Sequence, residues 1–115
     1  GGSGQGRTYV LAPFGDAPRS AAAVATVTAG DRVLTLEVTG LPPSPEGSFY
    51  ELWLLNSPTD LVSLGSFRLP ASGPATFSVP LPSDPERFRF LDISVEPVDG
   101  DPAHSGASVL RGQTA

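Results

Sequence analysis

Apolar and polar residues alternate along this chain in short runs, and glycine or proline separates one run from the next. The clearest alternation lies in residues 32–39, where Leu34, Leu36 and Val38 share one face of an extended chain. Successive side chains of a strand point to opposite faces, so this pattern predicts a β-strand with one buried face. Seven further segments are predicted to be strands: residues 7–11, 20–29, 48–56, 61–69, 75–81, 87–96 and 108–111.

Residues 20–29 are the one segment that also allows a helix. Its alanines favour a helix and Ser20 could cap one, but its second half is rich in β-branched residues. The sequence Ala29-Gly30-Asp31 then offers a tight turn into residues 32–39. We therefore predict a β-hairpin over the two segments, with a helical start as the alternative.

The strand predicted for residues 48–56 is apolar on both faces. Tyr50, Leu52 and Leu54 share one face, and Trp53 lies on the other face beside Glu51. A strand of this kind belongs inside its sheet, with cover on at least part of each side.

Glycine and proline mark further features of the predicted strands and loops. Gly65 interrupts the strand at residues 61–69, which indicates a β-bulge or the close approach of another backbone. Loops are predicted at residues 40–47, 70–74 and 97–106.

Short strands and frequent turns, without a helical stripe, indicate an all-β fold. We predict an antiparallel β-sandwich of about eight strands, immunoglobulin-like in general architecture. The chain of 115 residues is long enough for one hydrophobic core. Residues 7–115 are expected to form a single domain, and the glycine-rich residues 1–6 a linker or a cloning remnant.

Composition excludes several classes of function. The net charge is −5 and the seven basic residues, all arginine, are scattered, so no basic stripe is available for nucleic acid. The sequence contains no cysteine, which rules out disulfides and cysteine–zinc sites. It also lacks a run of about 18 apolar residues that could span a membrane.

Candidate catalytic and metal-binding residues are few. His104 is the only histidine; it shares a polar loop with Asp101 and Ser105, and we interpret it as an exposed loop residue rather than a catalytic base. Asp99 and Asp101 have half the spacing of a calcium loop, but residue 103 is alanine where a third ligand would belong. We predict a solvated acidic loop, no metal, no cofactor and no enzymatic activity.

Trp53 has two interpretations. The simpler one is a buried or half-buried packing residue. The alternative is an aromatic contact for a sugar, a peptide or a protein partner, as carbohydrate-binding sandwiches use. Because the chain has only one tryptophan, the packing interpretation is favoured over an aromatic binding surface.

Several motifs in order resemble the C-terminal domain of the anti-sigma-K factor family. They are the sequence YELWLL at residues 50–55, VSLGSF at 62–67, the GLPP step at 40–43 and ISVEP at 93–97, followed by Gly100, Pro102 and the VLRG ending at 109–112. The resemblance covers roughly residues 20–112, and His104-Ser105 departs from the Pro-Thr pair common in the family. The motif positions, to which we assign structural roles, are Tyr50, Leu52, Trp53, Gly65, Phe67, Glu96, Pro97, Gly100 and Pro102.

The resemblance implies a role in bacterial signal transduction. Members are membrane-anchored regulators whose N-terminal cytoplasmic segment holds an extracytoplasmic-function sigma factor inactive, until regulated proteolysis releases it. This chain would be the domain outside the membrane, with the membrane helix before residue 7. It would sense an unknown protein or envelope signal and would not bind the sigma factor itself. The main alternative is a free-standing secreted module that binds carbohydrate or protein; an enzyme is a third possibility.

Overall fold

The computed structural model describes residues 6–28, 30, 32–69 and 74–114. It confirms the all-β prediction: the strands pair in antiparallel fashion, and these residues contain no α-helix. The elements are β1 (Arg7–Pro13), β2 (Ala22–Val27), β3 (Val33–Thr39), β4 (Ser48–Ser57), β5 (Asp60–Phe67), β6 (Ala75–Pro80), the 3₁₀ turn η1 (Pro85–Arg87), β7 (Phe90–Pro97) and β8 (Ser108–Gln113).

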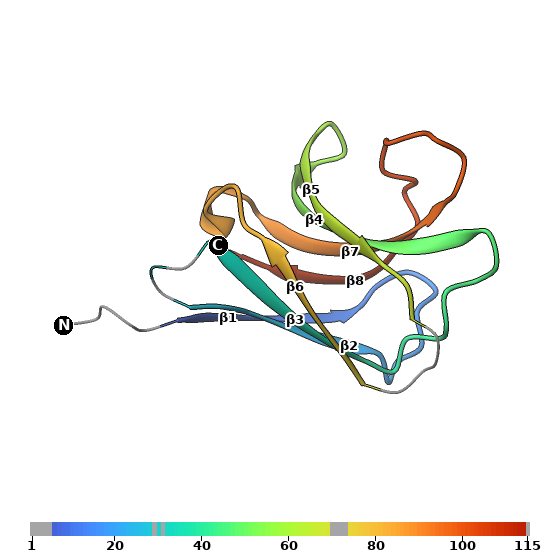
Figure 1. Ribbon diagram of the computed structural model, residues 1–115, viewed down its shortest axis with the longest axis horizontal. Helices are drawn as coiled ribbons and strands as arrows, with labels where there is room; N and C mark the ends of the chain where they lie inside the picture. Colours follow the sequence, from blue (N-terminus) through green and yellow to red (C-terminus); the bar gives the residue numbers. More distant parts are fainter. Residues whose placement is uncertain (1–5, 29, 31, 70–73, 115) are drawn as a thin grey trace.

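All eight strands belong to one sheet, in the order β5-β4-β7-β8-β1-β2-β3-β6. Strand β1 joins its two halves, because it pairs with β2 from Arg7 to Leu11 and with β8 at Ala12 and Pro13. Figure 1 shows the resulting curl, which brings β4, β5 and β7 over β1, β2 and β3. The fold thus combines the two facing layers of a sandwich with the continuous sheet of a barrel.

The ends of the sheet, β5 and β6, meet through side chains and not as hydrogen-bonded neighbours. The rings of Phe67 and Phe77 lie 4.5 Å apart between centroids. A Cβ on Gly65 would stand 3.3 Å from Cγ1 of Val79, so this glycine lets β6 approach. The β4–β5 register also shifts beside Gly65, which confirms the predicted bulge. The neighbour that approaches Gly65 is the side chain of Val79, and not another backbone as the alternative prediction had it.

The core lies between the two halves of the curled sheet. The alternating residues of β3 enter it as predicted, and Tyr50, Leu52 and Leu54 of β4 enter it from the opposite half. The hydroxyl of Tyr50 donates to the carbonyl oxygen of Pro42 at 2.7 Å and so fixes the loop before β4. Burial of that hydroxyl raises the pKa of Tyr50.

Residues 22–27 form a strand, so the hairpin prediction is confirmed and its helical alternative is wrong. The register pairs Val27 with Leu34 and Ala25 with Leu36. Ala23, Ala25 and Val27 are buried at every second position, and this burial overrides the helix propensity of alanine. Gly30 has the positive φ of a turn residue, 85°, while the flanking Ala29 and Asp31 lie outside the described residues.

Each strand has a boundary that differs from the prediction by about one to three residues, and two predicted segments lie largely outside the described residues. Strand β7 begins at Phe90 because η1 occupies residues 85–87, where the Asp84 side chain accepts the Glu86 N–H at 2.9 Å. Strand β8 continues to Gln113. Residues 1–5 of the predicted linker and 70–73 of the predicted loop lie outside the described residues.

Candidate functional site

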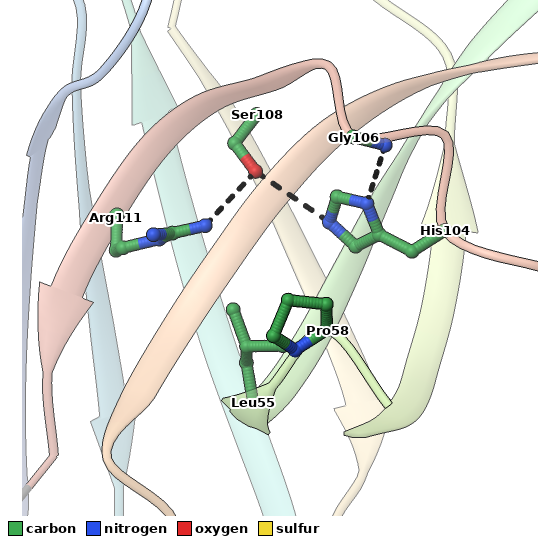
Figure 2. A pocket seen from close by; sticks show the side chains of 6 residues that line it. All are labelled: Leu55, Pro58, His104, Gly106, Ser108 and Arg111. Carbon is green, nitrogen blue, oxygen red and sulfur yellow. Dashed lines mark hydrogen bonds between the residues drawn. The ribbon is translucent and has the colours of Figure 1, made fainter. Parts of the chain in front are cut away.

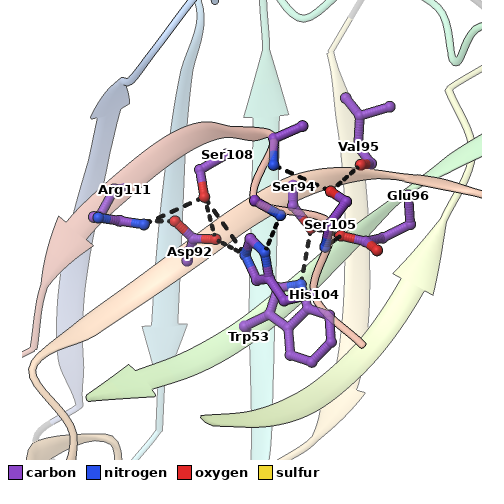
Figure 3. Close-up of polar contacts among 11 residues, drawn as sticks. Trp53, Asp92, Ser94, Val95, Glu96, His104, Ser105, Ser108 and Arg111 are labelled. Atoms are coloured by element: carbon purple, nitrogen blue, oxygen red, sulfur yellow. Dashed lines mark hydrogen bonds and ion pairs between the residues drawn. The ribbon is translucent and has the colours of Figure 1, made fainter. Parts of the chain in front are cut away.

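A buried polar cluster lies on the face of β4, β7 and β8 that points away from the core. Residues 98–107, called the cover loop below, fold over this face. Trp53 is opposite Asp92 in the β4–β7 register and Glu51 is opposite Ser94, so all four residues share the covered face. Figure 3 shows this cluster beneath the cover loop.

Asp92 is the centre of the cluster and is fully buried. Its Oδ1 accepts from Nε of Arg111 at 2.8 Å, across the β7–β8 register. Its Oδ2 accepts from Oγ of Ser108 at 2.8 Å and lies 2.7 Å from Nε2 of His104. A buried carboxylate is tolerated when it is paired and hydrogen-bonded, and Asp92 meets both conditions.

His104 connects the cover loop to Asp92, and its side chain is only 11 % exposed. The prediction of an exposed loop histidine is therefore wrong. Its Nδ1 accepts the N–H of Gly106 at 2.8 Å, so in the neutral ring Nε2 carries the proton and donates it to Asp92. The ring also packs against Trp53, with centroids 5.0 Å apart.

The geometry around His104 does not match a catalytic triad. A triad base needs a free ring nitrogen toward the nucleophile and the carboxylate on the other nitrogen. Here Ser108 and Asp92 approach the same nitrogen, and the acceptor nitrogen is occupied by Gly106. Ser108 donates to Asp92 and is not activated, so the arrangement holds the loop in place.

A second branch of the cluster runs from Trp53 to Glu96. Nε1 of Trp53 donates to Oγ of Ser94 at 2.9 Å, and that hydroxyl donates to Oε2 of Glu96 at 2.5 Å. The same oxygen accepts the N–H of Ser105 at 3.0 Å, which pins the cover loop at a second point. Trp53 is 4 % exposed, so the predicted packing role is confirmed.

Glu51 lies beside this cluster, with Ser63 of β5 donating to its Oε2. Desolvation raises the pKa of Glu51, and the nearby Glu96 adds to the increase; the bond from Ser63 and the proximity of His104 oppose it.

The acidic tip of the cover loop is exposed, as predicted for Asp99 and Asp101. The Oδ1 atoms of these residues accept the N–H groups of Asp101 and Ala103 at 2.9 and 3.0 Å, the pattern of two successive Asx turns. In the part of the chain that the structure describes, no three or more His, Asp or Glu side chains are grouped to hold a metal ion.

A cleft opens between the β4–β5 turn and the cover loop. Its inner cavity, of about 230 Å³, is shown in Figure 2. Its outer cavity, of about 510 Å³, shares Pro58 and His104 with the inner one. The inner cavity is lined by Leu55, Pro58, His104, Gly106, Ser108 and Arg111. The outer cavity is lined by Trp53, Pro58, Thr59, Leu61, Asp101, Pro102, Ala103 and His104.

The structure brings some of the motif positions together and separates others. Tyr50 and Phe67 stack in the core with ring centroids 5.7 Å apart, next to Leu52. Trp53 and Glu96 meet through Ser94. Three other motif positions are exposed where β7 ends and in the cover loop: Pro97, Gly100 and Pro102.

Sequence reasoning missed the other members of the cluster. Asp92 and Ser94 alternate with apolar residues in their strand, which is also the pattern of a solvated outer face. The only available signal was the equally apolar second face of residues 48–56, which required a cover.

Comparison with known proteins gives one result. Residues 4–108 match the sequence model of the family described as "Anti-sigma-K factor rskA, C-terminal". No curated protein and no solved structure gave a significant match. Within the described residues, no helix is both long and apolar enough to cross a membrane.

Proposed function

The chain belongs to the anti-sigma-K factor family, as its C-terminal domain, and we propose that it is the extracytoplasmic regulatory domain of a membrane-anchored anti-sigma factor. The match covers nearly all of the described chain and confirms the resemblance carried by the motifs around Trp53 and Glu96. In this proposal a separate N-terminal segment holds the sigma factor. The domain receives an envelope signal, and regulated proteolysis of the whole protein then releases the sigma factor.

The observation that carries the proposal is the coupling of the cover loop to the sheet beneath it. His104 and Ser105 of this loop bind Asp92 and Glu96 of β7, and Trp53 of β4 joins both branches. An event at the loop therefore reaches two interior strands through direct contacts. The ring of His104 offers no free acceptor nitrogen, which supports a non-catalytic role.

The cleft favours a second candidate, a free-standing ligand-binding or adhesion module. A carbohydrate-binding surface presents aromatic ring faces to the sugar. Trp53 is instead almost fully buried and tied to Ser94. This burial argues against sugar stacking on Trp53, so the regulatory function is preferred.

A topology measurement in the full-length natural protein tests the proposal. Alkaline phosphatase, which is active only after export, is fused after residue 115, and green fluorescent protein that folds only in the cytoplasm replaces it in the matched fusion. We expect phosphatase activity without fluorescence. A fluorescent and phosphatase-negative pair would overturn the extracytoplasmic placement.

A reporter gene driven by the cognate sigma factor tests the regulatory role. Deletion of residues 7–115 from the full-length protein should uncouple reporter output from envelope stress. The matched control, Glu37→Gln at an exposed position of β3, keeps the rest of the domain and should retain stress control. Unchanged stress control after the deletion would contradict a regulatory function.

A further inference from the structure

We propose that the cleft binds a carboxylate with a short apolar tail, and that Arg111 recognises the carboxylate. This names the ligand class of the domain and takes its biological meaning from the regulatory function proposed above. The binding itself is a property of the cleft and can be measured separately.

The guanidinium of Arg111 is fixed in an orientation that suits the binding of an anion. Its Nε donates to Asp92 at 2.8 Å and its Nη2 to Ser108 at 3.3 Å, while the ring of Phe14 lies 4.1 Å from its Cζ. These contacts fix the guanidinium, and among the described residues Nη1 has no hydrogen-bond partner, so it can donate to another acceptor. In Figure 2 the guanidinium points toward Ser108 and His104, above Leu55 and Pro58. Such a fixed group loses little conformational entropy when it binds a ligand.

The charge facing the inner cavity is positive. Asp92 balances Arg111 but is fully buried behind it, with both oxygens already accepting hydrogen bonds. His104 directs its Nε2 toward Asp92 and accepts the N–H of Gly106 with Nδ1, so both ring nitrogens already have partners. Arg111, whose side chain is 26 % exposed, is thus the charged group that an entering ligand meets there. Asp101 lines the outer cavity and not the inner one, so the anionic end of a ligand belongs in the inner one.

The rest of the cleft suits an apolar tail. Leu55 and Pro58 line the inner cavity, and Leu61 and Pro102 continue the apolar wall in the outer one. Ligand sites have volumes of about 300–1,000 Å³ and combine apolar walls with a few converging polar groups. The inner cavity, of about 230 Å³, is smaller than this range and matches a carboxylate group with a few carbon atoms or the last residue of a peptide, whereas the outer cavity, of about 510 Å³, lies within the range.

Titration of the labelled protein, followed by ¹H–¹⁵N NMR, tests this inference. The probes are hexanoate, its uncharged analogue hexanamide, and acetate, which has no tail. We expect hexanoate to shift the amides of Gly106, Ser108 and Arg111 saturably, with at least tenfold tighter binding than either analogue. Equal shifts with all three probes, or shifts centred on the exposed Arg7 instead, would overturn the proposal.

Two pairs of variants assign the effect to the cleft. Arg111→Gln should abolish hexanoate binding, whereas Arg89→Gln, at an exposed arginine outside the cleft, should not. If loss of Arg111 unfolds the protein, Pro58→Asp adds a negative charge at an exposed position on the cleft wall. It should weaken hexanoate binding at least threefold relative to Pro58→Asn and leave hexanamide unaffected. Equal hexanoate affinities for the two Pro58 variants would refute an anion site.

Two further probes separate the sources of the carboxylate. An acetylated leucine dipeptide is compared with its C-terminal amide. Tight binding of the free acid alone identifies a chain terminus as a ligand, whereas binding of hexanoate without the dipeptide restricts the site to small acids. Failure of all the carboxylates would leave the regulatory function intact, because the topology and reporter measurements do not depend on the cleft.

Discussion

At the scale of single residues, Trp53 joins the sheet to its cover. It is 4 % exposed, its ring packs on His104 and its Nε1 donates to Ser94. Trp53→Ala removes the packing and the donor, and large aromatic truncations of this kind cost about 3–5 kcal/mol. We expect that loss in the free energy of urea unfolding. Trp53→Phe, which keeps most of the packing, should cost clearly less, and a loss below about 1 kcal/mol for alanine would contradict the buried role.

Glu51 should make the stability of the protein depend on pH. Its folded-state pKa is raised, chiefly by desolvation, so the folded protein holds this proton more readily than the unfolded chain does. Stability from this group is therefore present at low pH and is lost as the pH rises from the unfolded to the folded pKa. Glu51→Gln, which can still accept from Ser63, should raise stability more at pH 7 than at pH 4.

Urea unfolding at both pH values measures this difference. The matched control is Glu37→Gln, because Glu37 is exposed on β3. It should change stability equally at the two pH values. An equal effect of Glu51→Gln at pH 4 and pH 7 would show that burial of Glu51 does not penalise its charge.

Residue types alone could not predict the buried cluster. The alternation of side chains along β4 correctly placed Trp53 and Glu51 on one face of the strand and Tyr50 and Leu52 on the other. It could not show that His104 returns to Asp92, because this contact depends on how residues 98–107 fold over β7. A polar residue on a covered face and one on a solvated face have the same local pattern.

At the scale of elements, the crossing of β1 from β8 to β2 requires close backbone approach. A Cβ on Gly112 would lie 2.2 Å from the carbonyl oxygen of Val10, a contact that backbone atoms cannot relieve by changing a rotamer. Gly112→Ala should therefore cost about 3 kcal/mol or more, at the upper end of overpacking effects. Gly100→Ala is the control, since its φ is +80° but its Cβ would meet no atom within 4 Å.

Thermal and urea unfolding of the two variants compare these effects. Gly100→Ala should show only the cost of a left-handed residue, about 1–2 kcal/mol. A Gly112→Ala protein as stable as Gly100→Ala would mean that β1 and β8 can separate at little cost.

The strands were predictable from local pattern because each buries one face at every second residue. Residues 22–27 were the difficult case, and burial of the alanines beside Leu34 and Leu36 decided it. The start of β7 was not predictable, because the 3₁₀ turn before it depends on the side chain of Asp84, which accepts the N–H of Glu86. This local hydrogen bond competes with the extension of the strand to Arg87.

At the scale of the whole molecule, the curl of the sheet results from pairings far apart in sequence. Ala12 pairs with Arg111, and Val38 pairs with Ala75. Alternation identifies the strands and their buried faces, but it carries no information on which strands are neighbours. An all-β fold of about eight strands could therefore be predicted, whereas the single sheet joined by β1 could not.

The β5–β6 seam is where we expect the folded protein to open first. Backbone hydrogen bonds connect all the strands that are neighbours in the sheet order. The two end strands, β5 and β6, are instead held together by side chains such as Phe67 and Phe77. Local openings expose elements with few cooperative contacts at a free energy below that of global unfolding. Amides of β6 bonded to β3 should therefore exchange with solvent through local opening, while those between β4 and β7 exchange only on global unfolding.

Native-state hydrogen exchange, followed by NMR in low urea, measures the two classes of amide. Phe77→Leu replaces one ring of the Phe67–Phe77 pair with a smaller side chain and so weakens the contact between β5 and β6. It should lower the protection of the β5 and β6 amides against exchange by more than it lowers global stability. Phe49→Leu is the matched control, because Phe49 is half-buried on β4 outside the core cluster. It should leave the difference between the seam and the β4–β7 pair unchanged. If amides of β6 show the same urea dependence as those of β4, the sheet opens as one unit, and its side-chain closure is as strong as a hydrogen-bonded one.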